Sequence, residues 1–111
     1  MEIKLLAEKR AVLVKIDGEI DHHIADSLRG AIDTKIRRTN AINVLFDFSE
    51  VSFMDSSGIG VIMGRYKQIK PLGGSVVIYG ENAHIKRIVD MSGIGRIVKI
   101  TRTLDEALKI I

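Results

Sequence analysis

The sequence predicts one α/β domain in which a small mixed β-sheet is covered by helices. Short runs of β-branched residues alternate with segments whose apolar residues recur every three or four positions. No helical segment separates the first two runs, so they must form a hairpin, whereas helices separate the later runs and favour parallel pairing. The expected order is β-β-α-β-α-β-α-β-α, and 111 residues suit a single domain over residues 1–111.

The first part of the chain predicts a hairpin followed by a helix. Residues 3–7 alternate between apolar and polar, as in a half-buried strand, and Ala11–Ile16 is a β-branched run that residues 17–18 are expected to stop. Asp21 is a good N-cap, and Asn40 is a good C-terminal stop for the helix between them. The predicted buried face of that helix consists of Ile24, Leu28, Ile32 and Ile36.

The middle of the chain predicts a buried strand, a loop and a second helix. Ile42–Phe48 is the strand and residues 49–54 are the loop. Residues 55–58 are N-cap types, and residues 71–74 contain the proline and glycines that end the helix. The apolar positions of this helix are Ile59, Ile62, Met63, Tyr66 and Ile69.

The last part of the chain predicts two further strand–helix pairs. The strands are Ser75–Tyr79 and Ile97–Ile100. Asn82 is expected to cap the third helix, which ends at residues 92–93, and Thr103 is expected to cap the fourth. The apolar faces of the two helices are Ile85, Ile88 and Val89, and then Leu104, Ala107, Leu108 and Ile111.

The composition excludes several classes of protein. The chain has no cysteine, which excludes disulfides, thiolate metal sites and cysteine catalysis. Residues 1–10 carry charges throughout and the apolar runs are short, so we expect no signal peptide, no membrane insertion and a cytoplasmic location. A net charge of +3 with no tryptophan does not indicate direct binding to nucleic acid. With 46% hydrophobic residues, the core requires no cofactor.

Histidines next to Asp21 raise the question of a metal site. His22 and His23 are adjacent, and the remaining histidine, His84, has no spacing relation to them. Neighbouring side chains on a helix point about 100° apart, so the pair is poorly placed to share one metal ion. The sequence favours Asp21 as an N-cap followed by two exposed histidines, and we expect no metal.

Nucleotide binding and serine catalysis receive weaker support than helix capping and packing. Gly58, Gly60 and Gly64 have a spacing one residue too long for a dinucleotide fingerprint, and we expect Gly60 and Gly64 to let the second helix pack closely. A hydrolase elbow needs glycine two residues before its serine, where Met54 precedes Ser56. No histidine is placed as a base for this serine.

Ser56 nevertheless lies where a phosphoryl group is well tolerated. Free N–H groups and the helix dipole stabilise anions at a helix N-terminus. A phosphoryl group adds about −1.5 to −2 charges and three acceptor oxygens. Phosphorylation of Ser56 would therefore change one surface spot without unfolding the domain.

Several segments resemble a known family. Residues 52–70, which contain Asp55-Ser56-Ser57-Gly58, closely resemble the anti-sigma-F factor antagonists of sporulation, a branch of the STAS domain family (sulphate transporter and anti-sigma antagonist). Residues 18–23, 86–88 and 90–93 resemble them as well, in the same order. The resemblance implies a STAS-type fold that agrees with the predicted order of elements.

The resemblance also implies a mechanism that is not enzymatic. The unphosphorylated protein binds an anti-sigma factor that is also a serine kinase, and this releases the sporulation sigma factor. The kinase uses ATP to phosphorylate the serine after the motif aspartate, which is Ser56 here, and a metal-dependent membrane phosphatase reverses the reaction. We expect the free protein to be a monomer whose backbone moves little on phosphorylation.

The residues expected to bind the partner follow from the same motifs. Asp55 is expected to cap the helix and present Ser56 to the kinase. Ser57 is the neighbouring serine that competes with Ser56 as phosphoacceptor, and Ile59 is an apolar anchor or a core residue. Gly58 and Gly60 are expected to admit the partner's backbone. The full expected surface is Asp21, Asp55, Ser56, Ser57, Gly58, Ile59, Gly60, Arg87 and Ile88.

Two alternatives remain open. The second interpretation, after the sporulation antagonist, is a STAS module of another stress or partner-switching circuit, with the same Ser56 chemistry and a different partner. A small nucleotide-binding protein or hydrolase is the alternative from another class, and it predicts nucleotide turnover by the isolated chain.

Overall fold

The structure, a computed structural model that describes residues 1–111, is a five-stranded sheet with helices on both faces. The strands follow the order β1-β2-β3-β4-β5, with β1 antiparallel to β2 and every other pair parallel. The predicted mixed sheet and order of elements are confirmed. The bounds are β1 (Glu2–Leu6), β2 (Ala11–Ile20), α1 (His22–Thr39), β3 (Asn43–Met54), α2 (Ser56–Ile69), β4 (Val76–Tyr79), α3 (Ala83–Ser92), β5 (Lys99–Thr101) and α4 (Leu104–Lys109).

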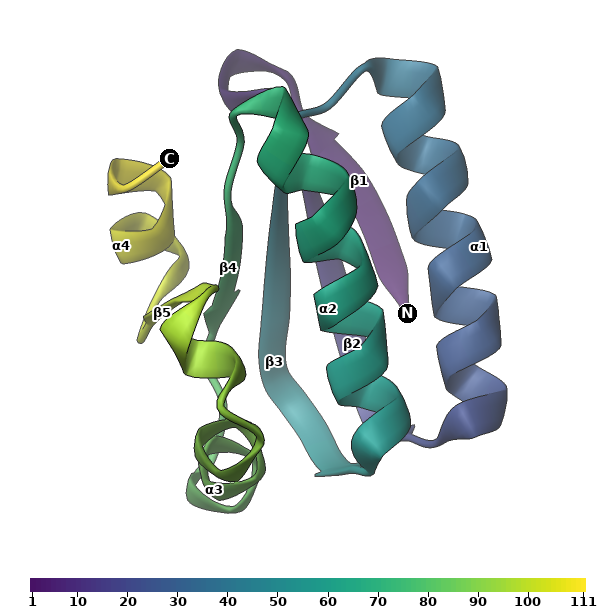
Figure 1. The fold of residues 1–111 in the computed structure, drawn as a ribbon, viewed down its shortest axis with the longest axis vertical. Helices are drawn as coiled ribbons and strands as arrows, with labels where there is room; N and C mark the ends of the chain where they lie inside the picture. Colours follow the sequence, from purple (N-terminus) through teal and green to yellow (C-terminus); the bar gives the residue numbers. More distant parts are fainter.

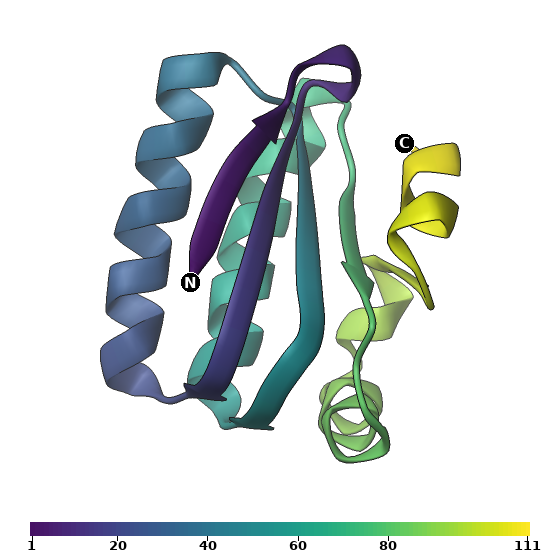
Figure 2. The same ribbon diagram turned by 180° about the vertical axis from the view of Figure 1, so that it is seen from behind.

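The helices divide unequally between the two faces of the sheet. Helices α1 and α2 lie side by side, and α2 is in front of the strands in Figure 1 and behind them in Figure 2. The main core lies beneath them and includes Val14, Phe46 and residues of α3. A smaller cluster on the other face joins Leu45 to Ala107 of α4. Apolar residues on both faces explain the nearly continuous apolar runs of the central strands.

Strands β2 and β3 are longer than the sequence indicated. The prediction that residues 17–18 stop the second strand was wrong, and residues 49–54 are strand rather than loop. These two stretches pair with each other, with Gly18 opposite Val51 and Ile20 opposite Met54. The register shifts twice along this pairing, and Gly18 adopts a φ of +81°. A strand containing turn-type residues can be sustained by its partner, because bulges absorb the irregularity.

The buried stripe of α1 starts one residue later than predicted. Ala25 is fully buried, whereas Ile24 is 41% exposed. Leu28, Ile32 and Ile36 are buried as expected. An exposed isoleucine in the first turn of a helix leaves apolar surface free at that end of the sheet.

The C-terminal elements are shorter than predicted. Strand β5 begins at Lys99 because Ile94–Arg96 forms a 3₁₀ turn, and Ile97 and Val98 donate their N–H groups to the Ile94 carbonyl. Helix α4 ends at Lys109 rather than at residue 111.

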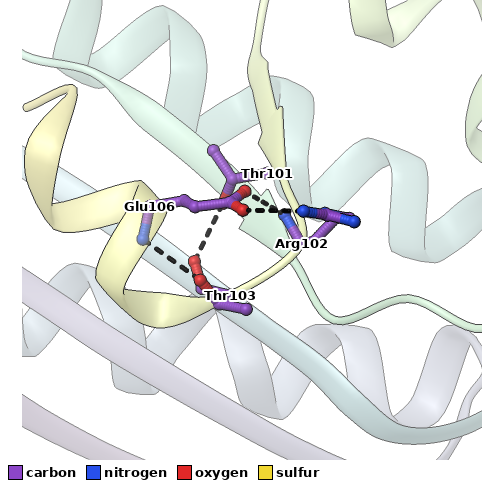
Figure 3. Close-up of polar contacts among 4 residues, drawn as sticks. All are labelled: Thr101, Arg102, Thr103 and Glu106. Atoms are coloured by element: carbon purple, nitrogen blue, oxygen red, sulfur yellow. Dashed lines mark hydrogen bonds and ion pairs between the residues drawn. The ribbon is translucent and has the colours of Figure 1, made fainter.

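The start of α4 is closed by side chains on both sides of its cap (Figure 3). Thr103 accepts a hydrogen bond from the Glu106 N–H at 3.2 Å, as predicted for an N-cap. The Glu106 carboxylate in turn accepts from the Arg102 N–H at 3.1 Å, and this bond is the main reason that its pKa is lowered. Reciprocal capping fixes a helix that is otherwise too short to be stable alone.

Asn43 is a buried amide that ties three segments together. Its Nδ2 donates to the Lys9 carbonyl and its Oδ1 accepts from the Ser75 N–H, each at 2.8 Å. The side chain is thus satisfied at the point where β2, β3 and β4 begin. The sequence pattern gave no sign of this role, because both partners are more than thirty residues away in the chain.

We predict that Asn43→Ala lowers the free energy of unfolding by about 1–3 kcal/mol, because it removes two partly buried hydrogen bonds and leaves the Lys9 carbonyl and the Ser75 N–H without this partner. Chemical denaturation followed by circular dichroism measures the change. Asn40→Gly is the matched control, since Asn40 is exposed with a left-handed φ of 55° that glycine adopts freely. A loss at Asn43 no larger than that at Asn40 would contradict the assigned role.

Candidate functional site

Parallel pairing of β2 and β3 places the starts of two helices at one edge of the sheet. Ile20 and Met54 are register partners at the carboxyl ends of their strands. Asp21 and Asp55 follow them directly, and the Asp55 N–H donates to the Ile20 carbonyl at 3.2 Å. Helices α1 and α2 therefore begin close together, at the lower edge in Figure 1. The structure thus brings together two residues that are distant in the sequence and that were both predicted to contact a partner.

Both aspartates are N-caps, as predicted. The Asp21 carboxylate accepts from the Ile24 N–H at 3.0 Å, and the Asp55 carboxylate accepts from the Ser57 N–H at 2.8 Å. The bond from Ile24, helped by His23, lowers the pKa of the Asp21 carboxyl. Neither side chain forms an ion pair within the chain. Each cap consequently holds a negative charge at the surface.

Ser56 and Ser57 differ in accessibility. Ser56 is the first residue of α2 and is exposed, whereas Ser57 is half-buried and its N–H is held by Asp55. A kinase must reach the hydroxyl and place it in line with a phosphoryl group. The exposed Ser56 meets this requirement better than its neighbour.

The structure explains the glycines of α2 differently from the sequence-based prediction. Gly58 is buried, and a Cβ there would overlap with Met54 and approach Ile20 at 3.3 Å. A close intramolecular contact therefore already requires glycine at 58. The prediction that Gly60 and Gly64 allow close helix packing was wrong for Gly64, where a Cβ would meet open space. Gly60 is exposed, and a Cβ there would lie 3.7 Å from Nη2 of Arg29.

We predict that Gly58→Ala destabilises the protein by about 1–3 kcal/mol through overpacking against Met54. Gly64→Ala, in the same helix, should instead raise the free energy of unfolding by about 0.5–1 kcal/mol, because alanine costs less backbone entropy. Thermal unfolding of both variants measures the difference. Equal effects of the two substitutions would show that Met54 makes room freely.

Of the remaining residues that were predicted to bind the partner, two pack against the core and one is exposed. Ile59 and Ile88 are half-buried and pack against the main core, so each has an intramolecular role. Arg87 is exposed, and its side chain makes no hydrogen bond or ion pair within the chain. No hydrogen bond or ion pair links Arg87 or Ile88 to Ser56, and their part in partner binding stays a prediction.

Helix α3 is anchored at this edge of the sheet by its predicted cap residue and by two contacts that the sequence did not indicate. Asn82 caps α3 by accepting from the Ile85 N–H at 2.9 Å, and its Nδ2 donates to the Val51 carbonyl at 3.1 Å. Phe53, 42% exposed, stacks on His84 with 6.4 Å between ring centroids. Because β3 was expected to end before Phe53, the contact could not be inferred from the sequence.

A buried arginine lies between α1 and α2. Arg65 has a side chain that is 9% exposed, and its Nε lies 3.2 Å from Oδ1 of Asp33. Burial lowers the pKa of Arg65, Asp33 opposes this shift, and Arg29 adds to it. The two arginines are therefore close enough to repel each other across the helix pair.

Glu81 is a partly buried acidic residue just before α3. The residue is half-buried, and its Oε2 is buried without a hydrogen-bond partner. Burial raises the pKa of the Glu81 carboxyl, and Lys86 only partly offsets this. Its charged form is thus less favourable in the folded chain than in the unfolded chain.

We predict that Glu81→Gln stabilises the protein at pH 7. The folded-state pKa lies above the unfolded value, so the charge costs stability once the pH rises through the folded pKa. The advantage of glutamine should therefore shrink as the pH falls towards the ordinary pKa of 4.5. Denaturation midpoints at pH 7 and pH 4 measure it, and an advantage that is the same at both would argue against a buried charge.

Comparison with known proteins identifies the family. Residues 2–107 match the STAS domain. An anti-sigma F factor antagonist of Paenibacillus polymyxa is 36% identical over 90% of this chain and 86% of its own length. An anti-sigma-B factor antagonist of Bacillus subtilis is 31% identical over 81% of each chain. The phosphorylated form of the Bacillus cell fate determinant SpoIIAA is 26% identical, with a TM-score of 0.75 over 98% of this chain and 96% of that one.

The chain therefore belongs to the STAS domain family and, within it, to the anti-sigma factor antagonists. The STAS-type fold expected from the sequence is confirmed. None of the helices combines the length and the apolar character that a membrane crossing needs.

Proposed function

We propose that the unphosphorylated chain binds an anti-sigma factor that is also a serine kinase, and so releases a sigma factor for transcription. The observation that carries this proposal is the exposed Ser56 beside two charged helix caps, in a chain whose relatives are named anti-sigma factor antagonists. The protein acts by binding and is not itself an enzyme. It works in the cytoplasm, where transcription takes place.

Phosphorylation of Ser56 switches the binding off. The Ser56 Oγ attacks the γ-phosphorus of ATP, the bond to the β-phosphate oxygen breaks, and ADP leaves as the hydroxyl proton is released. A dianion then replaces a neutral hydroxyl in the centre of the contact surface. An uncompensated charge buried in an interface costs about 3–5 kcal/mol, which corresponds to a loss of affinity of a hundredfold or more.

A metal-dependent phosphatase restores the binding form by hydrolysing the phosphoserine. Asp21 and Asp55 offer carboxylates to basic residues of the anti-sigma factor, since both lie at this edge without an ion pair in the chain. Ser57, Gly60, Ile59, Arg87 and Ile88 complete the proposed surface, with Gly58 supporting it from inside.

We predict that the sporulation anti-sigma kinase with ATP adds one phosphate to the chain, and that fragment mass spectrometry places it on Ser56. Ser56→Ala should abolish the addition, whereas the matched variant Ser57→Ala should retain it, because Ser57 is half-buried. Phosphate that persists in Ser56→Ala would refute the assignment. The unmodified chain should bind the kinase with ADP at least a hundredfold more tightly than the phosphorylated chain.

A second circuit is supported by a specific observation. The 31% identity to the B. subtilis anti-sigma-B factor antagonist makes a stress-response kinase the alternative partner. Complex formation with the two kinases, compared side by side in ADP, decides between them. The isolated chain should not hydrolyse ATP or GTP at high protein concentration. Sustained hydrolysis that depends on Ser56 would instead support a nucleotide-hydrolysing protein.

A further inference from the structure

Arg29 of α1 lies against α2 beside Gly60. Gly60 has no side chain, and the space where its Cβ would extend is bordered by Nη2 of Arg29 at 3.7 Å. Gly60 comes one helical turn after Ser56, and residues four apart lie on the same side of a helix. The guanidinium therefore lies beside the second turn of α2, one turn from the proposed phosphorylation site.

The direction of the Arg29 side chain brings its charge towards the start of both helices. Its Nη1 pairs with Oδ1 of Asp26 at 2.6 Å, three residues nearer the N-terminus of α1. Helix side chains generally lean in that direction. Asp26 and Arg29 have side chains that are 79% and 39% exposed, so water screens their pair and a stronger anion can replace the carboxylate.

The other charged groups of α1 and α2 near this edge do not supply a free cation. Asp21 and Asp55 are anions held by backbone N–H groups. His22 and His23 are exposed in the first turn of α1 and pack ring to ring, 4.1 Å between centroids. Arg65, the other arginine between the helices, is buried and faces Asp33. Arg29 combines a partly exposed guanidinium with a position beside α2.

We infer that Arg29 is the intramolecular counter-cation of phosphorylated Ser56. The guanidinium leaves Asp26 and pairs with the phosphate oxygens, a geometry in which arginine forms two parallel hydrogen bonds. The phosphate charge is then met within the chain, and the start of α2 has no reason to rearrange. The partner then meets a phosphate in place of a neutral hydroxyl, and the Arg29 guanidinium is directed at Ser56 instead of Asp26. The inference rests on the proposed function and specifies how that site is regulated.

The test uses the full chain with phosphoserine installed at position 56 during synthesis, so it does not depend on any kinase. Phosphorus NMR measures the second pKa of the phosphate, which is about 6 in an ordinary phosphoserine. A neighbouring cation favours the dianion, so Arg29→Gln should raise this pKa by about 0.2 to 0.7. Arg29→Lys should retain part of the effect.

Arg37→Gln is the matched control. Arg37 is exposed on the same helix two turns further on, where its side chain contacts Thr34. The control removes the same charge and keeps Asp21, His22, His23, Asp26 and Asp55, whose titration affects both variants equally. The same phosphate pKa in Arg29→Gln and Arg37→Gln would overturn the inference.

A second measurement detects the pairing directly. The Arg29 Nε–H resonance should move downfield when Ser56 carries phosphate, and a resonance at the position seen in the unmodified chain would also overturn the inference. If the anti-sigma kinases leave Ser56 unmodified, the proposed function fails while these measurements remain valid, so the two failures are distinguishable.

Discussion

The parallel pairing of β2 with β3 is the interaction on which the rest of the site depends. It extends past the turn-type residues of β2 and ends with Ile20 opposite Met54. Since a helix starts directly after each of these residues, the pairing fixes where both helix N-termini lie. A slip of one residue would send one set of side chains to the wrong face of the sheet, so the buried core enforces the register that the site requires.

The start of α2 is built to stay in place while its surface chemistry changes. Met54 fills the space beneath Gly58, and Asp55 holds the Ser57 N–H, so the backbone around Ser56 is restrained from inside and from its cap. Anions are favoured at such a position by the helix dipole. This rigidity fits a switch that works by adding charge rather than by refolding, and Arg29 gives the added charge a partner within the chain.

The buried polar groups of the domain differ in their effect on stability. Asn43 is fully paired and joins segments that are remote in sequence, whereas Arg65 meets only Asp33 and Glu81 has an orphaned oxygen. The first stabilises the fold, because breaking it leaves buried groups without partners. The other two reduce stability, because burial disfavours the charged form of each side chain.

The sequence by itself determined the order of elements, the helix caps at Asp21, Asp55, Asn82 and Thr103, and Ser56 as the residue to test. These depend on local periodicity and on side chains that bond to backbone a few residues away, and both are visible in the linear chain. Tertiary structure alone decided the lengths of β2 and β3, the burial of Gly58 rather than Gly64, and the placement of Arg29 beside α2. Each of these results from contacts between segments far apart in the chain, whose packing overrides the local preference of residues such as those at 17–18.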